Sequence, residues 1–354
     1  MVKGTRILQA MSMLALIATL GFTGQAPIMA QTAAPTPAAT AANSYGQWAS
    51  DATATSQYGD TGWSAQQATG LPNVTECADN GNAWASKSKT GVDTLTVTFS
   101  SPTVPTELDI YESFTPGSIT GVELIPADGS KAIPIGQNTS DVGTSCPAIF
   151  QIHVSGVTGT VKGAIIHLDQ TKSASWDEID AVQLIGTLPP GVTTQWASRA
   201  SATSQYDDPK WSAMQASGPP NVTTCGDDNN AWASSQSNGV DTLTVNYATP
   251  MIPTQVNIYE TYNPGSITSI DLIPADGSAA IPVPKSADSA LTVCPRVFAV
   301  TLSGITQPIS AVAIHLDQTK SASWNEIDAV QMLGTVAASN SSLDTLPATA
   351  AATP

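Results

Sequence analysis

Residues 167–183 read HLDQTKSASWDEIDAVQ, and residues 315–331 read HLDQTKSASWNEIDAVQ. The two stretches differ only where Asp177 is replaced by Asn325, and an offset of 148 residues separates His167 from His315. The same offset relates Trp48 to Trp196, so it extends over the whole mature region. A period this long predicts two tandem copies of one domain, because solenoid repeats have periods of about 20–50 residues.

Each copy has the pattern of β structure. Thr94 to Phe99 and Glu107 to Glu112 alternate between apolar and polar residues, and further apolar runs cover 119–125, 149–154, 163–168 and 179–185. Asp128-Gly129 and its copy Asp276-Gly277 are strong turn signals. No long stretch shows the 3.6-residue period of an amphipathic helix. We therefore predict an all-β fold of two tandem jelly-roll β-sandwiches.

The two ends of the chain have a different composition. Lys3 and Arg6 precede an apolar stretch that is followed by small residues up to Ala30, which is the pattern of a secretory signal peptide. We accordingly expect the following organisation: signal peptide 1–30, Pro/Ala/Thr-rich linker 31–43, first β-sandwich module 44–187, short linker 188–193, second module 194–336 and disordered tail 337–354. This organisation predicts a secreted protein, extracellular or periplasmic.

The charge balance excludes two classes of partner. Acidic residues number 28 and basic residues 12, and the net charge is −16. Nucleic acids and anionic membranes both require basic clusters, so neither is an expected partner. The apolar run after Arg6 is shorter than the ~20 residues of a membrane span, so we expect no membrane insertion.

The cysteines repeat with the modules. An exported protein with an even number of cysteines most simply pairs them within each copy. We predict the disulfides Cys77–Cys146 and Cys225–Cys294, whereas a metal site would need closely spaced pairs of ligands.

Several motifs resemble a known family. Trp63-Ser-Ala-x-Gln-Ala-x-Gly-x-Pro-Asn73 is followed by Asn82-Ala-Trp-Ala-Ser86 and, at the last strand, by Trp176-x-Glu-Ile-Asp-Ala-Val182. These motifs resemble the galactose-binding-like β-sandwich superfamily, which includes discoidin-type domains and family 32 carbohydrate-binding modules. The nearest likeness is to the "scarf" modules of pappalysin-type proteins and their bacterial relatives. The resemblance implies the fold more than the function, because such domains bind sugars, lipids or proteins, or act as spacers.

The resemblance also bears on calcium. Many of these domains hold a structural calcium ion through a glutamate at the start of the last strand, and this position corresponds to Glu178 and Glu326. The family's usual aspartate loop is absent here, but hard cations take oxygen ligands, which neighbouring residues carry. The implied metal ligands are Asp79, Asn82 and Glu178 in the first module and Asp227, Asn230 and Glu326 in the second. The alternative is that the glutamate accepts hydrogen bonds from loop amides; no other cofactor is expected.

Aromatic residues in loop-like sequence suggest a binding surface. An exposed ring can stack on a sugar while nearby polar side chains bind its hydroxyl groups. The predicted ligand-binding residues are Trp63, Glu112, Phe114 and Trp176, with the copies Trp211, Glu260, Tyr262 and Trp324. The alternative for any of these tryptophans is a core anchor, and we expect that role for Trp84 and Trp232.

Catalytic patterns are weak. The sequence has neither a Gly-x-Ser-x-Gly nucleophile elbow nor a His-Glu-x-x-His motif. Glu178 and Asp180 lie two apart on a predicted strand, about 6–7 Å from each other, a separation that glycosidases also use. Their position is that of the family's calcium and packing residues, however, so we expect no enzyme.

These observations predict an exported, non-catalytic and monomeric protein that recognises carbohydrate or another extracellular surface ligand through two repeated modules. The alternative is a protein-interaction or structural module of the cell envelope without a small-molecule site. An aromatic-floored polar cleft would favour the first function, and an exposed apolar patch the second.

Overall fold

The computed structural model describes residues 44–136, 145–284, 286–287 and 293–337. The predicted signal peptide and first linker, and the predicted tail from residue 338 onward, lie outside the described residues. Within them, no helix is long and apolar enough to cross a membrane.

The regular elements of the described chain are β-strands and short 3-10 helices. The strands of the first module are β1 (Ser44–Trp48), β2 (Asp51–Ala54), β3 (Val92–Phe114), β4 (Ile119–Pro126), β5 (Ile133–Ile135), β6 (Ala148–His153), β7 (Val161–Asp169) and β8 (Glu178–Thr187). The second module repeats them as β9 (Thr193–Trp196), β10 (Arg199–Ala202), β11 (Val240–Tyr262), β12 (Ile267–Pro274), β13 (Ile281–Pro282), β14 (Arg296–Thr301), β15 (Ile309–Asp317) and β16 (Glu326–Val336). The 3-10 helices are η1 (Ala65–Ala68), η2 (Gln170–Lys172), η3 (Ala213–Ala216) and η4 (Gln318–Lys320).

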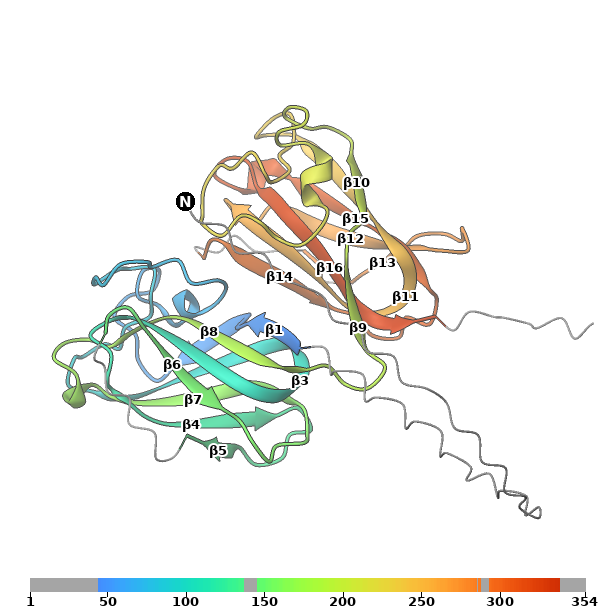
Figure 1. Cartoon of the computed structure of the whole chain (residues 1–354). Helices are drawn as coiled ribbons and strands as arrows, with labels where there is room; N and C mark the ends of the chain where they lie inside the picture. Colours follow the sequence, from blue (N-terminus) through green and yellow to red (C-terminus); the bar gives the residue numbers. More distant parts are fainter. Residues whose placement is uncertain (1–43, 137–144, 285, 288–292, 338–354) are drawn as a thin grey trace, which may run out of the picture. The chain divides into compact units, whose positions relative to one another are not determined.

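The long strand β3 belongs to both layers of the first sandwich. Its first part pairs with β2 and β7, and β7 continues through β4 to β5. Its second part pairs with β6 on one side and β8 on the other, and β8 continues to β1. All of these pairs are antiparallel, and the register on β7 shifts between Thr98 and Thr103, where the strand changes layer (Figure 1). The second module has the same topology with β11 in the place of β3.

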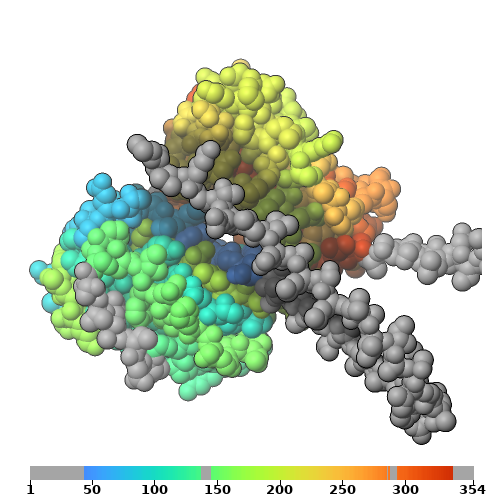
Figure 2. Space-filling view, in the orientation of Figure 1, coloured from blue at the N-terminus to red at the C-terminus, as the bar shows by residue number. Residues whose placement is uncertain are grey.

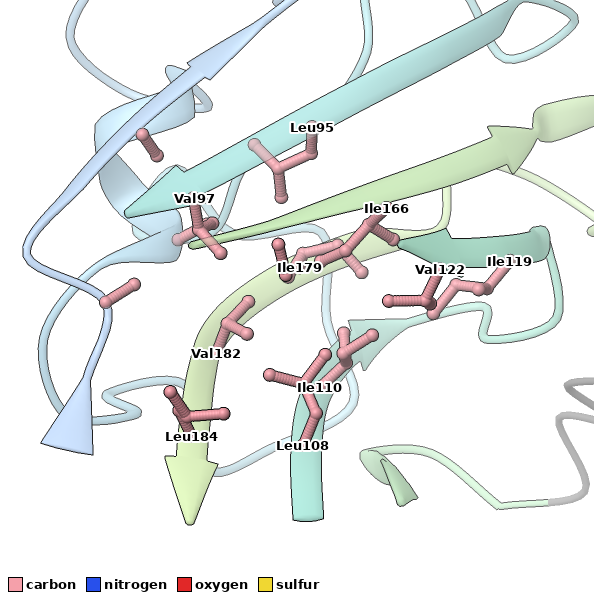
Figure 3. Close-up of a cluster of buried hydrophobic side chains, with 14 of the residues drawn as sticks. Leu95, Val97, Leu108, Ile110, Ile119, Val122, Ile166, Ile179, Val182 and Leu184 are labelled. Carbon is pink, nitrogen blue, oxygen red and sulfur yellow. The ribbon is translucent and has the colours of Figure 1, made fainter. Parts of the chain in front are cut away.

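Apolar side chains from the two layers meet in a closed core. In β3 the inward residues are Leu95 and Val97 before the change of layer and Leu108 and Ile110 after it, and all four are fully buried. Figure 3 shows them together with the apolar residues of β4, β7 and β8. Full burial of such side chains contributes about 1.5–3 kcal/mol each, so this core supplies most of the driving force for folding.

The structure confirms the predicted all-β sandwich in both copies, with one difference in its elements. The runs Thr94 to Phe99 and Glu107 to Glu112 were expected as separate strands, but they are parts of the single strand β3. Asp128-Gly129 ends a turn in which the Gly129 N–H donates to the Pro126 carbonyl, and Gly129 has a positive φ of 80°. Trp84 and Trp232 are fully buried, as expected.

The predicted disulfides are confirmed. Cys77 is bonded to Cys146, and Cys225 is bonded to Cys294. Each bond joins the long loop after the second strand of its module to the segment just before β6 or β14. This loop carries several of the residues described below, so the disulfide helps to fix it.

Candidate functional site

Two loops of each module carry the candidate site. In the first module these are the loop between β2 and β3 and the loop that leads from β7 into β8. The first of these loops is the light-blue stretch that lies on the surface in the space-filling view (Figure 2). Trp84, at the inner side of this loop, forms a β-bridge with Ile179 of β8 and thereby holds the two loops together.

Three aromatic rings of the first module contact one another. The ring of Tyr58 lies edge-on to Trp63, at 5.5 Å between centroids, and edge-on to Trp176, at 5.6 Å. The second module repeats this arrangement, with Tyr206 at 5.4 Å from Trp211 and 5.5 Å from Trp324. Tyr58 is 57% exposed and Tyr206 is 54% exposed, so the tyrosine is the solvent-facing member of each group.

The backbone of the first tryptophan in each group is strained. Trp63 has φ = 55° and Trp211 has φ = 50°, in the left-handed region that bulky residues rarely adopt. Hydrogen bonds hold Trp63 in place: its N–H donates to the Gly81 carbonyl, and its carbonyl accepts the N–H of Ala85. Strain of this kind costs about 1–3 kcal/mol and is concentrated at ligand sites.

A carboxyl pair lies beside these rings. Asp79 Oδ1 accepts a hydrogen bond from the indole Nε1 of Trp63 at 2.9 Å, and Glu178 Oε2 accepts one from the backbone N–H of Asn80 at 3.1 Å. Asp227 accepts from Trp211, and Glu326 accepts from Asp228, at 2.9 and 3.0 Å. Glu178 and Glu326 are each only 1% exposed.

The buried glutamates are poor acids. The pKa of Glu178 is raised to about 8, chiefly by burial and also by the charge of Asp79 and a hydrogen bond with it, against the opposing effect of the Asn80 amide. Burial likewise raises the pKa of Glu326 to about 8, with Asp227 acting in the same direction. Each glutamate therefore holds a proton at neutral pH unless a positive charge is brought beside it.

In the second module these groups border a small open cavity. In the second module a cavity of about 80 Å³ is lined by Tyr206, Trp211, Asp227, Ala233, Trp324 and Glu326. The first module has the same residue types at the equivalent positions, namely Tyr58, Trp63, Asp79, Ala85, Trp176 and Glu178. We call each set of six residues the aromatic pocket.

The structure thus brings together residues that were predicted for two different roles. Trp63 and Trp176 were predicted ligand-binding residues, while Asp79 and Glu178 were predicted metal ligands, and all four lie in one pocket. Tyr58 was not selected from the sequence. Its signal was its presence in the Thr-Ser-Gln-Tyr motif that both copies contain.

The predicted glutamates of β3 and β11 lie elsewhere. Glu260 is fully buried and accepts hydrogen bonds from Nε and Nη2 of Arg296, both at 2.9 Å, and from Asn325 at 2.6 Å. Glu112 follows the inward register of Leu108 and Ile110 and is 1% exposed. We therefore leave both glutamates out of the aromatic pocket.

Phe114 and Tyr262 also lie outside the set that lines the pocket. They end β3 and β11, where their backbones pair with those of Glu178 and Glu326. Both side chains are half-buried. They border the strand that carries the buried glutamate, and the ring contacts found among the described residues do not include them.

The pocket offers few of the ligands that a calcium ion needs. Ca²⁺ takes about six to eight oxygen ligands, whereas the pocket contributes the carboxyl groups of one aspartate and one glutamate. Asn230 Nδ2 donates to Asp228 Oδ1 at 3.0 Å. In the part of the chain that the structure describes, no three His, Cys, Asp or Glu side chains are grouped so that they could hold a metal ion.

The paired carboxyls of β8 bind different segments of the loop between β2 and β3. Glu178 accepts from Asn80, while Asp180 accepts from the backbone N–H groups of Asn73 and Val74. Burial raises the pKa of Asp180 to about 6 against the effect of these two hydrogen bonds. The two side chains thus support two separate loop segments.

Comparison with known proteins identifies the repeated domain. The family model described as "PAPPA: Pappalysin-1, SD scarf domain, C-terminal" matches residues 38–191 and again residues 187–343. No curated protein matches the sequence.

Solved structures give weaker likenesses. A fucolectin from the serum of striped bass (Morone saxatilis) is 13% identical, with a TM-score of 0.31 over 82% of this chain and 99% of that chain. An F5/8 type C domain from Bacteroides fragilis is 12% identical, with a TM-score of 0.32 over 42% of this chain and 100% of that chain. Allantoicase from Saccharomyces cerevisiae is 12% identical, with a TM-score of 0.31 over 82% and 90%. Likenesses of this size carry no argument about a ligand.

Proposed function

Because the chain belongs to the family of the pappalysin-1 SD scarf domain, C-terminal, we propose that it is an exported, non-catalytic protein that binds a glycan through the aromatic pocket of each module. Two disulfides support export, since such bonds persist in oxidising compartments. Glu178 and Asp180 bind different segments of one loop, which supports a role other than hydrolysis, because a glycosidase needs both carboxyls at one bond.

One observation carries this proposal: the aromatic pocket is built twice with the same residue types and the same contacts. The indole of Trp63 hydrogen-bonds Asp79 at 2.9 Å, and the indole of Trp211 hydrogen-bonds Asp227 at 2.9 Å. Both tryptophans also have the same strained backbone. A core needs neither exposed tyrosines nor left-handed tryptophans, whereas a site that displays rings to a ligand uses both.

Two equivalent sites on one chain favour a polymeric ligand. If both pockets reach the same polymer, the second contact forms at a high effective concentration. Weak single sites then give useful overall affinity, which suits recognition of a surface glycan.

The test is a glycan array probed with the wild-type chain and with the double variant Trp63→Ala/Trp211→Ala. We expect the wild type to bind a coherent set of related glycans and the variant to lose binding by about tenfold or more, since one stacked ring contributes roughly 0.5–1.5 kcal/mol beyond its buried area. Melting temperatures of both proteins show whether the variant is still folded.

A matched control removes two other tryptophans. Trp48 and Trp196 contact Tyr111 and Tyr259 and do not line the pocket, so Trp48→Ala/Trp196→Ala should retain binding. Equal binding by the wild type and the Trp63→Ala/Trp211→Ala variant would contradict the proposed site. An array without any bound glycan would instead favour a protein-interaction module.

A further inference from the structure

The size of the aromatic pocket limits what enters it. Its volume is about 80 Å³ in the second module, whereas sites that enclose a whole small molecule measure about 300–1,000 Å³. The pocket is therefore too small for a whole sugar and takes one substituent of it. A glycan bound over the tyrosine therefore inserts a single substituent and leaves its rings outside.

The walls of the pocket favour a cation. The rings of Tyr206, Trp211 and Trp324 all border the cavity. The face of an aromatic ring carries negative charge and attracts an ammonium or guanidinium group within about 6 Å. Tryptophan gives the strongest attraction of this kind, and two of the three rings are tryptophans.

The floor of the pocket favours the same charge. The carboxyl groups of Asp227 and Glu326 border the cavity and offer oxygen atoms to the N–H groups of a cation. Among the described residues, the ion pairs found involve other carboxylates, and none brings a lysine, arginine or histidine to this pair. A cation from outside the chain would give the buried Glu326 the positive partner that a buried carboxylate needs.

We infer that each aromatic pocket binds the ammonium group of an amino sugar, so that the glycan recognised is one with free amines rather than N-acetyl groups. The inference rests on the proposed glycan-binding function and names the substituent that enters the pocket. A primary amine on a ring carbon fits the volume, donates hydrogen bonds to two carboxyls and lies against the three rings. A neutral hydroxyl could form the hydrogen bonds but would lack the electrostatic attraction to the rings and the carboxyl groups.

Isothermal titration calorimetry of the full chain tests this with four probes: a glucosamine hexamer, the N-acetylglucosamine hexamer, the glucose hexamer and trilysine. We expect the glucosamine hexamer to bind at least about tenfold more tightly than either neutral hexamer, which corresponds to 1.4 kcal/mol. Trilysine carries the same amine without a sugar and should bind more weakly than the glucosamine hexamer.

Variants locate the effect. Glu178→Gln/Glu326→Gln keeps the shape and the acceptor oxygen but removes the charge, and it should weaken glucosamine binding about tenfold or more. The control Asp128→Asn/Asp276→Asn replaces one carboxyl group per module as well, but in the exposed turns that precede β5 and β13. This control should bind as the wild type does. Circular dichroism checks that both variants are folded.

Each outcome decides the inference. Preference for free amines, lost in the glutamine variant but kept in the control, supports it. Equal binding of N-acetylated and free hexamers, or an unaffected glutamine variant, overturns the ammonium while leaving the glycan-binding function in place. Trilysine binding as tightly as the hexamer overturns the sugar as the source of the amine. Failure of the glucosamine hexamer to bind at millimolar concentration also overturns the inference, and the glycan array then decides the proposed function separately.

Discussion

At the scale of single residues, Trp63 and Trp211 show how the chain displays a large ring. Their left-handed backbones aim the side chain across the loop, where the indole meets Asp79 or Asp227 and the edge of a tyrosine. Most residues avoid this conformation because Cβ approaches the neighbouring carbonyl. The ring contacts and the two backbone hydrogen bonds must therefore offset the strain.

This strain predicts an unusual order of stability among variants. Glycine adopts positive φ freely, so Trp63→Gly should be more stable than Trp63→Ala by about 1 kcal/mol in free energy of unfolding. At Trp48, which lies in the extended strand β1, the order should be reversed, since glycine in a strand costs more entropy than alanine. Urea unfolding of the four variants measures both differences. Alanine being the more stable residue at both positions would contradict a strained Trp63.

At the scale of elements, β8 and β16 begin with buried acids. Glu178 and Asp180 flank the core residue Ile179 on β8, and both have raised pKa values because they are buried. Each accepts backbone N–H groups from the loop between β2 and β3, so the strand and the loop hold each other in place. The cost of this arrangement is an acid that resists ionisation in the folded state.

These strands predict a definite dependence of stability on pH. The pKa of Glu178 rises from 4.5 to about 8 on folding, so between these values the folded state holds more protons than the unfolded state. The free energy of unfolding must then fall as pH rises from about 4.5 to about 8. Glu178→Gln/Glu326→Gln should remove much of this fall and exceed the wild type by more than about 1 kcal/mol at pH 9.

Guanidinium unfolding at pH 5, 7 and 9 measures this dependence. The variant Asp128→Asn/Asp276→Asn is the control, because those exposed aspartates have lowered pKa values and should leave the fall intact. A wild-type stability that stays constant across this range, or an equal fall in the glutamine variant, would contradict the buried acids.

Sequence patterns predict the elements better than the site. Alternation located β3, β4, β6, β7 and β8, because one face of each strand packs against the core. The same alternation places Glu112 in the inward register of Ile110, although its acidic type suggested a binding surface. The acidic side chain of Glu112 indicated a binding surface, whereas its place in the strand alternation indicated burial. The observed burial agrees with the alternation.

The pocket depends on loop conformation, which local patterns do not encode. Trp211 and Trp232 belong to similar Trp-containing motifs, yet one borders the cavity of its module and the other is buried in the core. The meeting of Tyr58, Asp79 and Glu178 requires contacts across 98 or more residues of sequence, such as that from Asn80 to Glu178. The disulfide that anchors this loop was predictable from the repeated cysteine spacing.

At the scale of the whole molecule, the net negative charge and the duplicated pocket both favour binding of a cationic polymer. The net charge of −16 attracts cationic polymers and repels anionic ones over the range set by salt. Two pockets of the same composition then allow one polymer to be held at two points. An acidic protein with duplicated aromatic pockets is therefore suited to a glycan that carries amines.

The number of sites per chain tests the account most directly. Isothermal titration calorimetry with a glucosamine trimer should give two sites for the wild type, one for Trp63→Ala, one for Trp211→Ala and none for the double variant. Such a result would show that both aromatic pockets bind and that they bind through their tryptophans. A single site in the wild type that survives both substitutions would contradict the account.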